Sequence, residues 1–93
     1  DTLPIDTTTH PFNVAVYPNP FSTDLSIKLQ SPIREDVTIQ VFNVEGKLVD
    51  RIEIKSIQEY VTTWNPKGLS SGVYFIHVKI GNVVLKKKVL LLH

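Results

Sequence analysis

The residues able to do chemistry in this chain are few and widely spaced. It contains three histidines and no cysteine, which excludes a thiolate metal site. The histidines, at His10, His77 and His93, lack the close spacing of metal ligands. Ser22, Asp24 and His77 could be combined into a hydrolytic triad, but no nucleophile elbow or oxyanion loop accompanies them. We therefore predict a protein that is not an enzyme and that holds no metal or cofactor.

The composition fits one small globular domain. Of the 93 residues, 42% are hydrophobic and 20% are charged, the balance of a folded chain. The net charge is only +1, whereas nucleic-acid-binding domains concentrate far more positive charge, so we expect no nucleic-acid partner. No apolar run reaches the roughly 20 residues that a membrane helix needs. The chain has no methionine and begins at Asp1, and we expect it to be a piece of a longer protein.

The start of the chain differs in composition from the rest. Residues 1–11, DTLPIDTTTHP, contain three consecutive threonines, two prolines and only two bulky apolar residues. Such a segment buries too little surface to offset the entropy of ordering it. We predict that residues 1–12 are a linker to an upstream part of the protein and that the folded domain spans residues 13–93.

From residue 13 onward, apolar residues recur with a period of two, which indicates half-buried strands. Turn residues interrupt this pattern at Pro18-Asn19-Pro20, Ser31-Pro32, Glu45-Gly46, Asn65-Pro66-Lys67-Gly68 and Gly81-Asn82. The pattern predicts an all-β fold, a seven-stranded antiparallel sandwich with immunoglobulin-like or fibronectin-like proportions. The expected core comprises Leu25, Ile27, Val37, Ile39, Val41, Ile52, Val73, either Tyr74 or Phe75, and Val89.

Local features predict details of the turns and of the last strands. Gly46 suits a left-handed conformation beside a bulge, and Gly81 suits the first position of a type II′ turn. Residues 73–80 are apolar at almost every position, so we expect this strand to be covered on both sides. Lys87 interrupts the apolar face of the last strand, which predicts either a bulge or a snorkelling lysine.

Four stretches, taken in order, carry a family resemblance. They read YPNPF at residues 17–21, VFNVEGKLV at 41–49, LSSGVYF at 69–75 and KKKVLLLH at 86–93. Their order and spacing over residues 16–93 resemble the type A C-terminal sorting domain of the type IX secretion system. That family often ends in lysine or arginine, where this chain has His93.

The resemblance implies a secretion signal with no catalytic activity. A domain of this family ends an exported cargo, docks on outer-membrane secretion machinery, and is typically removed by a sortase-like peptidase. The cargo crosses the periplasm and the outer membrane and becomes secreted or bound to the cell surface. We expect a monomer. The family-motif residues, as candidates for recognition by the translocon, are Tyr17, Pro18, Asn19, Pro20, Gly46, Gly72, Tyr74, Lys86, Lys88, Val89, Leu91 and His93.

Many of these residues also have a purely structural interpretation. The prolines of YPNPF end strand pairing whatever their function, and Gly46 and Gly72 serve backbone conformation. Lys86, Lys87 and Lys88 could protect an exposed edge strand from aggregation or supply charge to a translocon that adds a strand, and the two roles are compatible.

Two other functions stay open from the sequence. Trp64, Tyr60 and Tyr17 would form a sugar platform in a carbohydrate-binding or adhesion module of a secreted hydrolase, provided that they are exposed and coplanar. A buried Trp64 would exclude this platform. A structural subunit that polymerises by strand exchange is the other alternative, and monomeric behaviour in ultracentrifugation would count against it.

Overall fold

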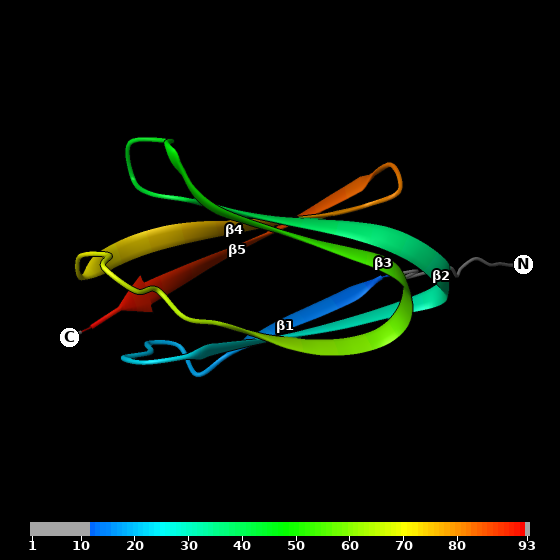
Figure 1. Ribbon diagram of the computed structural model, residues 1–93, viewed down its shortest axis with the longest axis horizontal. Helices are drawn as coiled ribbons and strands as arrows, with labels where there is room; N and C mark the ends of the chain where they lie inside the picture. The colour runs from blue at the N-terminus through cyan, green and yellow to red at the C-terminus, as the bar shows by residue number, and fades with distance from the viewer. Residues whose placement is uncertain (1–11, 93) are drawn as a thin grey trace, which may run out of the picture.

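Five antiparallel strands build the described part of the chain. The computed structural model describes residues 12–92 (Figure 1). No helix in this part is long and apolar enough to cross a membrane. The strands are β1 (Asn13–Tyr17), β2 (Leu25–Phe42), β3 (Leu48–Trp64), β4 (Gly72–Ile80) and β5 (Val83–Leu91).

All five strands belong to one sheet, which curls around a single core. The strand order is β1-β2-β4-β5, and β3 pairs with β2 off this path. The first part of β2 lies between β1 and the end of β3, and its last part lies between β4 and the start of β3. The curled sheet therefore has a three-stranded layer, with β1 at its edge, and a four-stranded layer, with β5 at its edge. Both β2 and β3 run through the two layers and bend between them (Figure 1).

The prediction of seven strands is wrong, because the described residues form five, and the immunoglobulin-like sandwich is not confirmed. Ser31-Pro32 does not end a strand, because β2 continues to Phe42 through register shifts on both sides of Glu35. Residues 48–64 likewise form one continuous strand, β3. A proline stops a regular ladder because it has no amide to donate, but at a bulge that donor is not needed. The two layers are thus parts of one bent sheet and not two separate sheets.

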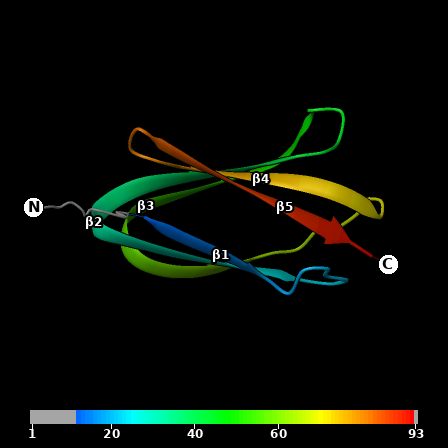
Figure 2. The ribbon, with the colours of Figure 1, turned by 180° about the vertical axis from the view of Figure 1, so that it is seen from behind.

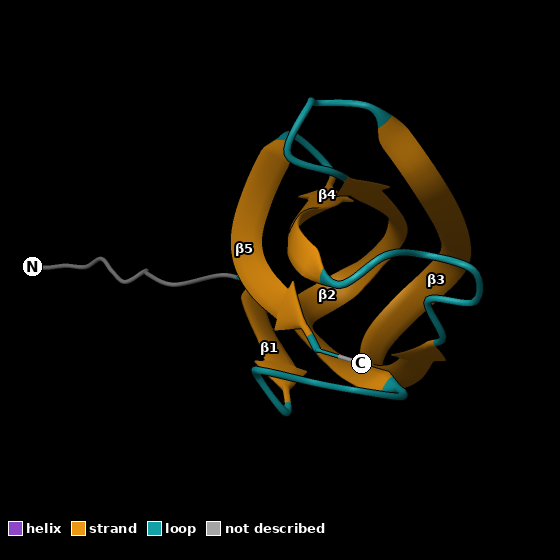
Figure 3. Cartoon of the chain, turned by 90° about the vertical axis from the view of Figure 1, so that its left-hand side faces the viewer, coloured by secondary structure: helices purple, strands orange, loops and turns teal. Residues whose placement is uncertain are grey.

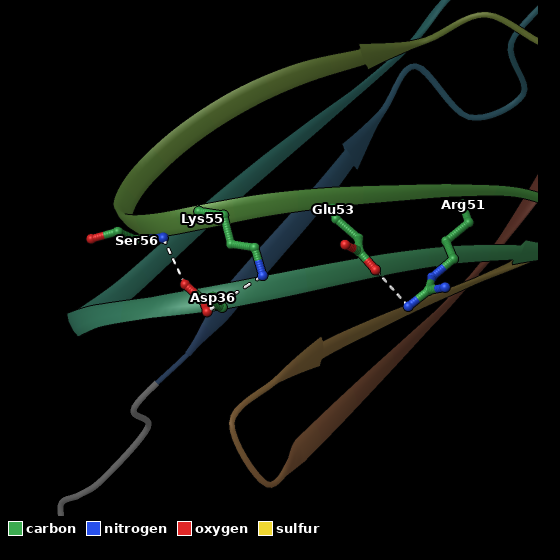
Figure 4. A network of polar contacts seen from close by, with 5 residues as sticks. All are labelled: Asp36, Arg51, Glu53, Lys55 and Ser56. Carbon is green, nitrogen blue, oxygen red and sulfur yellow. Dashed lines mark hydrogen bonds and ion pairs between the residues drawn. The ribbon is translucent and has the colours of Figure 1, made fainter.

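Polar contacts hold the bend of β2 and β3 (Figure 4). Asp36 accepts a hydrogen bond from the Ser56 amide at 2.9 Å, and its other oxygen lies 3.7 Å from the Lys55 ammonium. Arg34 donates to the Ser56 carbonyl at 3.0 Å. Ser56 has a φ of +51°, in the left-handed region that residues other than glycine rarely adopt. The shifted ladder leaves the amide and carbonyl of Ser56 without a partner strand, and the side chains of Asp36 and Arg34 bond them instead. β3 therefore bends without ending.

The core lies between the two layers and follows the predicted alternation. Ile52 and Val73 are only half-buried, because Ile52 lies on an edge strand and Val73 points outward from β4. The outer face of β4 is partly exposed throughout, so the prediction that this strand is covered on both faces is wrong. The predicted core residues that are buried are Leu25, Ile27, Val37, Ile39, Val41, Tyr74 and Val89.

The hairpin of β4 and β5 has the predicted turn but no bulge. Ile80 pairs with Val83 across a two-residue turn in which Gly81 has a φ of +58°, as the first position of a type II′ turn requires. The register then runs without a shift to the end of β5. Lys87 therefore keeps its place on the core-facing side of the strand, although its side chain is exposed.

Candidate functional site

Parts of all four motif stretches lie at one end of a molecule that measures 48 × 24 × 22 Å. The loop of residues 18–24, the turn of residues 43–47, the loop of residues 65–71 and the end of β5 all lie there (Figure 1). We call these segments the motif end. β1 begins at the opposite end of the long axis (Figure 1), so the motif end lies far from the point where the chain enters the fold.

Within YPNPF, the side chain of Asn19 bonds the backbone of β5. Its Nδ2 donates to the Lys88 carbonyl at 3.1 Å, and its Oδ1 accepts from the Leu90 amide at 3.0 Å. The peptide bonds before Pro18 and Pro20 are both cis. An asparagine side chain carries one amide donor group and one carbonyl acceptor, as a strand residue does. Asn19 therefore takes the place of a neighbouring strand at this part of the outer edge of β5.

Phe21 extends this contact through its backbone. Its amide donates to the Leu90 carbonyl at 2.9 Å, and its carbonyl accepts from the Leu92 amide at 2.9 Å. These two bonds make a short parallel bridge to Leu91. The Phe21 ring is only 2% exposed and packs against Trp64 with ring centroids 5.9 Å apart. YPNPF thus covers the end of β5 and is itself anchored in the core.

Trp64 is the centre of a buried aromatic group behind these loops. Its ring centroid lies 6.1 Å from that of Tyr74, and its Nε1 donates to Asp50 Oδ2 at 2.7 Å. The Tyr74 hydroxyl donates to the Ser70 carbonyl at 2.7 Å. Trp64 is only 2% exposed, so the three-ring sugar platform considered from the sequence does not form.

Asn43 organises the turn of the second stretch. Its Oδ1 accepts from the Glu45 amide at 2.9 Å and from the Lys47 amide at 3.0 Å. The Gly46 amide donates to the Asn43 carbonyl at 3.0 Å. Gly46 has a φ of +82°, the left-handed conformation predicted for it, and a register shift lies beside the turn. The contacts of this stretch are those of a well-formed turn.

A groove of about 390 Å³ lies beside Asn19. Its walls come from three of the four stretches, with the lining residues Asn19, Val73, Lys88, Val89 and Leu90. Val73 and Leu90 face each other across the β4–β5 ladder, and both are half-buried on the outer face of the sheet. The groove offers aliphatic walls and one ammonium group. It suits an apolar side chain that has a negative charge close by.

Three lysines and a histidine lie on the outer face of β4 and β5. Lys86 is the cross-strand neighbour of His77, and Lys79, Lys86 and Lys88 are all exposed. The His77 ring packs against Phe42 with centroids 4.7 Å apart. Burial lowers the pKa of His77 below its usual value of 6.5, and the positive charges of Lys86 and Lys79 lower it further. Burial and the positive charge already on this face therefore disfavour protonation of His77.

The triad considered from the sequence is not assembled. Asp24 accepts a hydrogen bond from Asn65 Nδ2 at 2.8 Å at the end of the three-stranded layer. His77 lies on the outer face of β4 in the other layer. His10 and His93 lie outside the described residues, and so does all of the linker predicted for residues 1–12 except Phe12.

The structure places some of the predicted site residues in the core and others at the surface. Val89 and Leu91 are buried and fill the core, as does Tyr74. Asn19 and Lys88 reach the surface of the motif end, where Asn19 bonds the Lys88 carbonyl. Pro18, Pro20 and Gly46 lie in the loops of the motif end, Tyr17 ends β1, Gly72 begins β4, and Lys86 lies near the middle of β5.

Sequence reasoning did not name Val73 and Leu90 as site residues. Both are apolar, and both lie on the outer face of the sheet. The nearly continuous apolar run of residues 73–80 gives no alternation that would mark Val73 as outward.

Comparison with known proteins decides the family. A family model described as the secretion system C-terminal sorting domain matches residues 15–92. The chain belongs to this family. The match runs from within β1 to the residue after β5 and includes all of the first three stretches and most of the fourth. No curated protein sequence matches the chain.

The family is that of type IX secretion signals. This sorting domain is therefore a C-terminal signal for export across the outer membrane, to the cell surface or the medium. The family is not known for enzymatic activity. The geometry of the motif end agrees with a binding role, since its groove joins aliphatic walls to an ammonium group.

Proposed function

We propose that the outer-membrane secretion machinery reads this sorting domain at its motif end. One observation carries the proposal. Parts of all four stretches that carry the family resemblance lie at that end, although they come from distant parts of the sequence (Figure 1). In this proposal the cargo is attached at the other end, where β1 begins. A surface that projects away from the cargo stays accessible whatever protein is exported.

The contacts of Asn19 and Phe21 support this role physically. They hold the backbone of Lys88, Leu90 and Leu92 through four hydrogen bonds of 2.9–3.1 Å. A surface that is already ordered binds without the entropic cost of ordering it. The groove beside Asn19 is thus a prepared site, with Leu90 as its apolar contact and Lys88 as its charge.

We also propose how the domain is joined to its cargo and removed. Residues 1–12 connect it to an upstream cargo, and a sortase-like peptidase cuts within or close to this segment. Phe12 packs against the core, so the cut falls before it. The domain acts as a monomer. In a limited digest, N-terminal sequencing should find the first cuts before Phe12, and first cuts within residues 37–80 would contradict this linker.

The export of a reporter fused in front of this chain, in a host with type IX secretion, tests the main proposal. The reporter should reach the medium or the cell surface with the domain and stay in the cell without it. Leu90→Asn should reduce export, because it makes the groove wall polar. Val61→Asn is the matched control, since Val61 is 54% exposed on β3, outside the groove.

Thermal melting of both variants shows whether each is folded. Folded Leu90→Asn that exports as well as Val61→Asn would show that the groove is not read. A wild-type fusion that stays inside the cell would overturn the function itself.

A further inference from the structure

The outer edge of β5 is covered at one end and open along the rest. β5 pairs only with β4, and the register of that hairpin has no shift. In an antiparallel ladder, the amide and carbonyl of one residue point to the same edge of the strand, and successive residues point to opposite edges. Leu90 and the Lys88 carbonyl bond outward to YPNPF. The amides and carbonyls of Val84 and Lys86 therefore point outward as well.

Nothing in the described part of the chain pairs with these outward groups. The bonds from Asn19 and Phe21 reach no further back than the Lys88 carbonyl. β1 lies on this side of β5 in Figures 2 and 3, but it pairs only with β2. We call residues 84–88 the open edge. It presents alternating donors and acceptors in strand conformation, which another strand can complete.

Positive charge follows the open edge on both faces of the sheet. Lys86, Lys87 and Lys88 are all exposed, with Lys87 on the opposite face from the other two. Among residues 12–92, none of the three has a carboxylate at ion-pair distance. The two ion pairs among residues 12–92 are Arg51–Glu53 (2.6 Å) and Lys55–Asp36 (3.7 Å), which lie on β3 and at its bend, away from β5 (Figure 4). The lysines of the open edge thus attract a partner with carboxylates on both faces of its strand.

We infer that the open edge binds an acidic, extended protein segment as an additional strand. The inference rests on the proposed function and names the chemistry of the partner: carboxylate side chains at successive positions opposite residues 86–88. Backbone hydrogen bonds supply affinity, and the lysines select against neutral and basic segments. Asn19 and Phe21 occupy the edge from the Lys88 carbonyl onward, so they set where the added strand stops.

A synthetic nine-residue peptide, Thr-Val-Thr-Glu-Glu-Glu-Thr-Val-Thr, is the probe, and the same peptide with three lysines in place of the glutamates is its control. Titration of the 93-residue chain, followed by NMR, should show binding of the glutamate peptide alone. The amide signals that move should be those of the open edge, and the Lys86 amide should exchange more slowly with solvent. Binding of both peptides, or of neither, overturns the inference.

Val84→Pro separates strand addition from charge attraction. It removes an outward amide and no bond to β4, and it keeps all three lysines. Binding of the glutamate peptide should weaken about tenfold, the effect of losing one hydrogen bond and fitting a proline ring. Binding that Val84→Pro leaves unchanged would be charge attraction alone, as for a polyanion such as dextran sulfate, and would overturn the inference.

Two double variants test the lysines while the edge stays intact. Lys86→Arg with Lys88→Arg should bind the glutamate peptide as the wild type does, whereas Lys86→Glu with Lys88→Glu should lose binding. If the glutamate variant binds equally well, the lysines only protect the edge from aggregation, and the inference fails.

Reporter export then separates this inference from the proposed function. Reduced export by folded Val84→Pro and by the glutamate variant, but not by the arginine variant, supports strand addition during export. Full export by all of them overturns the inference and leaves the proposed function standing. A wild-type fusion that is not exported overturns the proposed function, whatever the peptide does.

Discussion

Asn19 shows how a single side chain can stand in for a strand. Replacing it with alanine leaves the Lys88 carbonyl and the Leu90 amide without their present partners. Both groups are near solvent, so water replaces part of what is lost, and we expect Asn19→Ala to lower the free energy of unfolding by about 1–2 kcal/mol. Asn13→Ala is the control, because Asn13 makes only a long 3.5 Å contact with Gln30. Urea denaturation measures both, and equal losses would contradict the role given to Asn19.

The His77 imidazole makes stability depend on pH. Its pKa in the folded domain is below 6.5, first because of burial and then because of Lys86 and Lys79. In the unfolded chain its pKa returns to the ordinary value, so near and below pH 6.5 the unfolded state binds more protons. The free energy of unfolding should therefore fall as the pH is lowered through 6.5 toward the folded pKa.

His77→Gln removes this titration and should flatten that part of the pH profile. Denaturation midpoints of both proteins, measured at several values between about pH 7.5 and pH 5.5, make the comparison. The other histidines are the same in the two proteins, so their contribution cancels. Parallel profiles would mean that His77 titrates equally in the folded and unfolded states.

Single residues were predictable where the cause is local. The left-handed conformations of Gly46 and Gly81 follow from their turns, and the structure has both. The bonds of Asn19 were not predictable in this way. They join residues 69 and 71 positions apart in the sequence, and no spacing within YPNPF indicates which backbone its asparagine reaches.

At the scale of elements, the alternation predicted which strand residues face the core better than it predicted where each strand ends. The prediction assigned Leu25, Ile27, Val37 and Ile39 to the core, where they lie. It placed them on two separate strands, whereas they belong to one, β2. Ser31-Pro32 and Gly81-Asn82 both look like turns in the sequence. Only the second reverses the chain, because at the first the partner strand β3 bends together with β2 and keeps pairing with it. That outcome depends on residues more than twenty positions away.

The bend offers a test at this scale. Ser56 has a φ of +51°, and only its backbone amide and carbonyl bond to Asp36 and Arg34. Left-handed backbone costs a non-glycine residue about 1–2 kcal/mol, whereas glycine pays a smaller entropic cost. Ser56→Gly should therefore stabilise the domain by about 0.5–1 kcal/mol in urea denaturation.

Ser26→Gly is the matched control for the bend. Ser26 lies in β2, pairs regularly with Thr63 of β3, and has no positive φ. Glycine at this position should therefore destabilise the domain by about 0.5–1 kcal/mol. Opposite signs for the two substitutions are the expected result. Destabilisation by both would show that Ser56 is not held in an unfavourable conformation.

In the whole molecule, folding and the proposed recognition depend on the same strand. A folded chain of 93 residues has a stability of about 5–14 kcal/mol by per-residue scaling. β5 supplies core residues on one face and reaches the motif end with its last residues. We expect deletion of residues 88–93 to abolish export, but it removes Val89 and Leu91 from the core as well. Deletion alone cannot tell a lost fold from a lost signal.

Two neighbouring leucines make the distinction. Leu91 is fully buried and Leu92 is 49% exposed. Leu91→Ala should lower the free energy of unfolding by about 2–5 kcal/mol, because it leaves a cavity in the core. Leu92→Ala should change it by less than about 0.5 kcal/mol, as a surface substitution does. Reporter export should then fall for Leu91→Ala, recover as the growth temperature is lowered, and stay at the wild-type level for Leu92→Ala. If Leu92→Ala melts normally and its fusion is nevertheless retained in the cell, the machinery reads the residue after β5 directly, and the last leucines do more than complete the core.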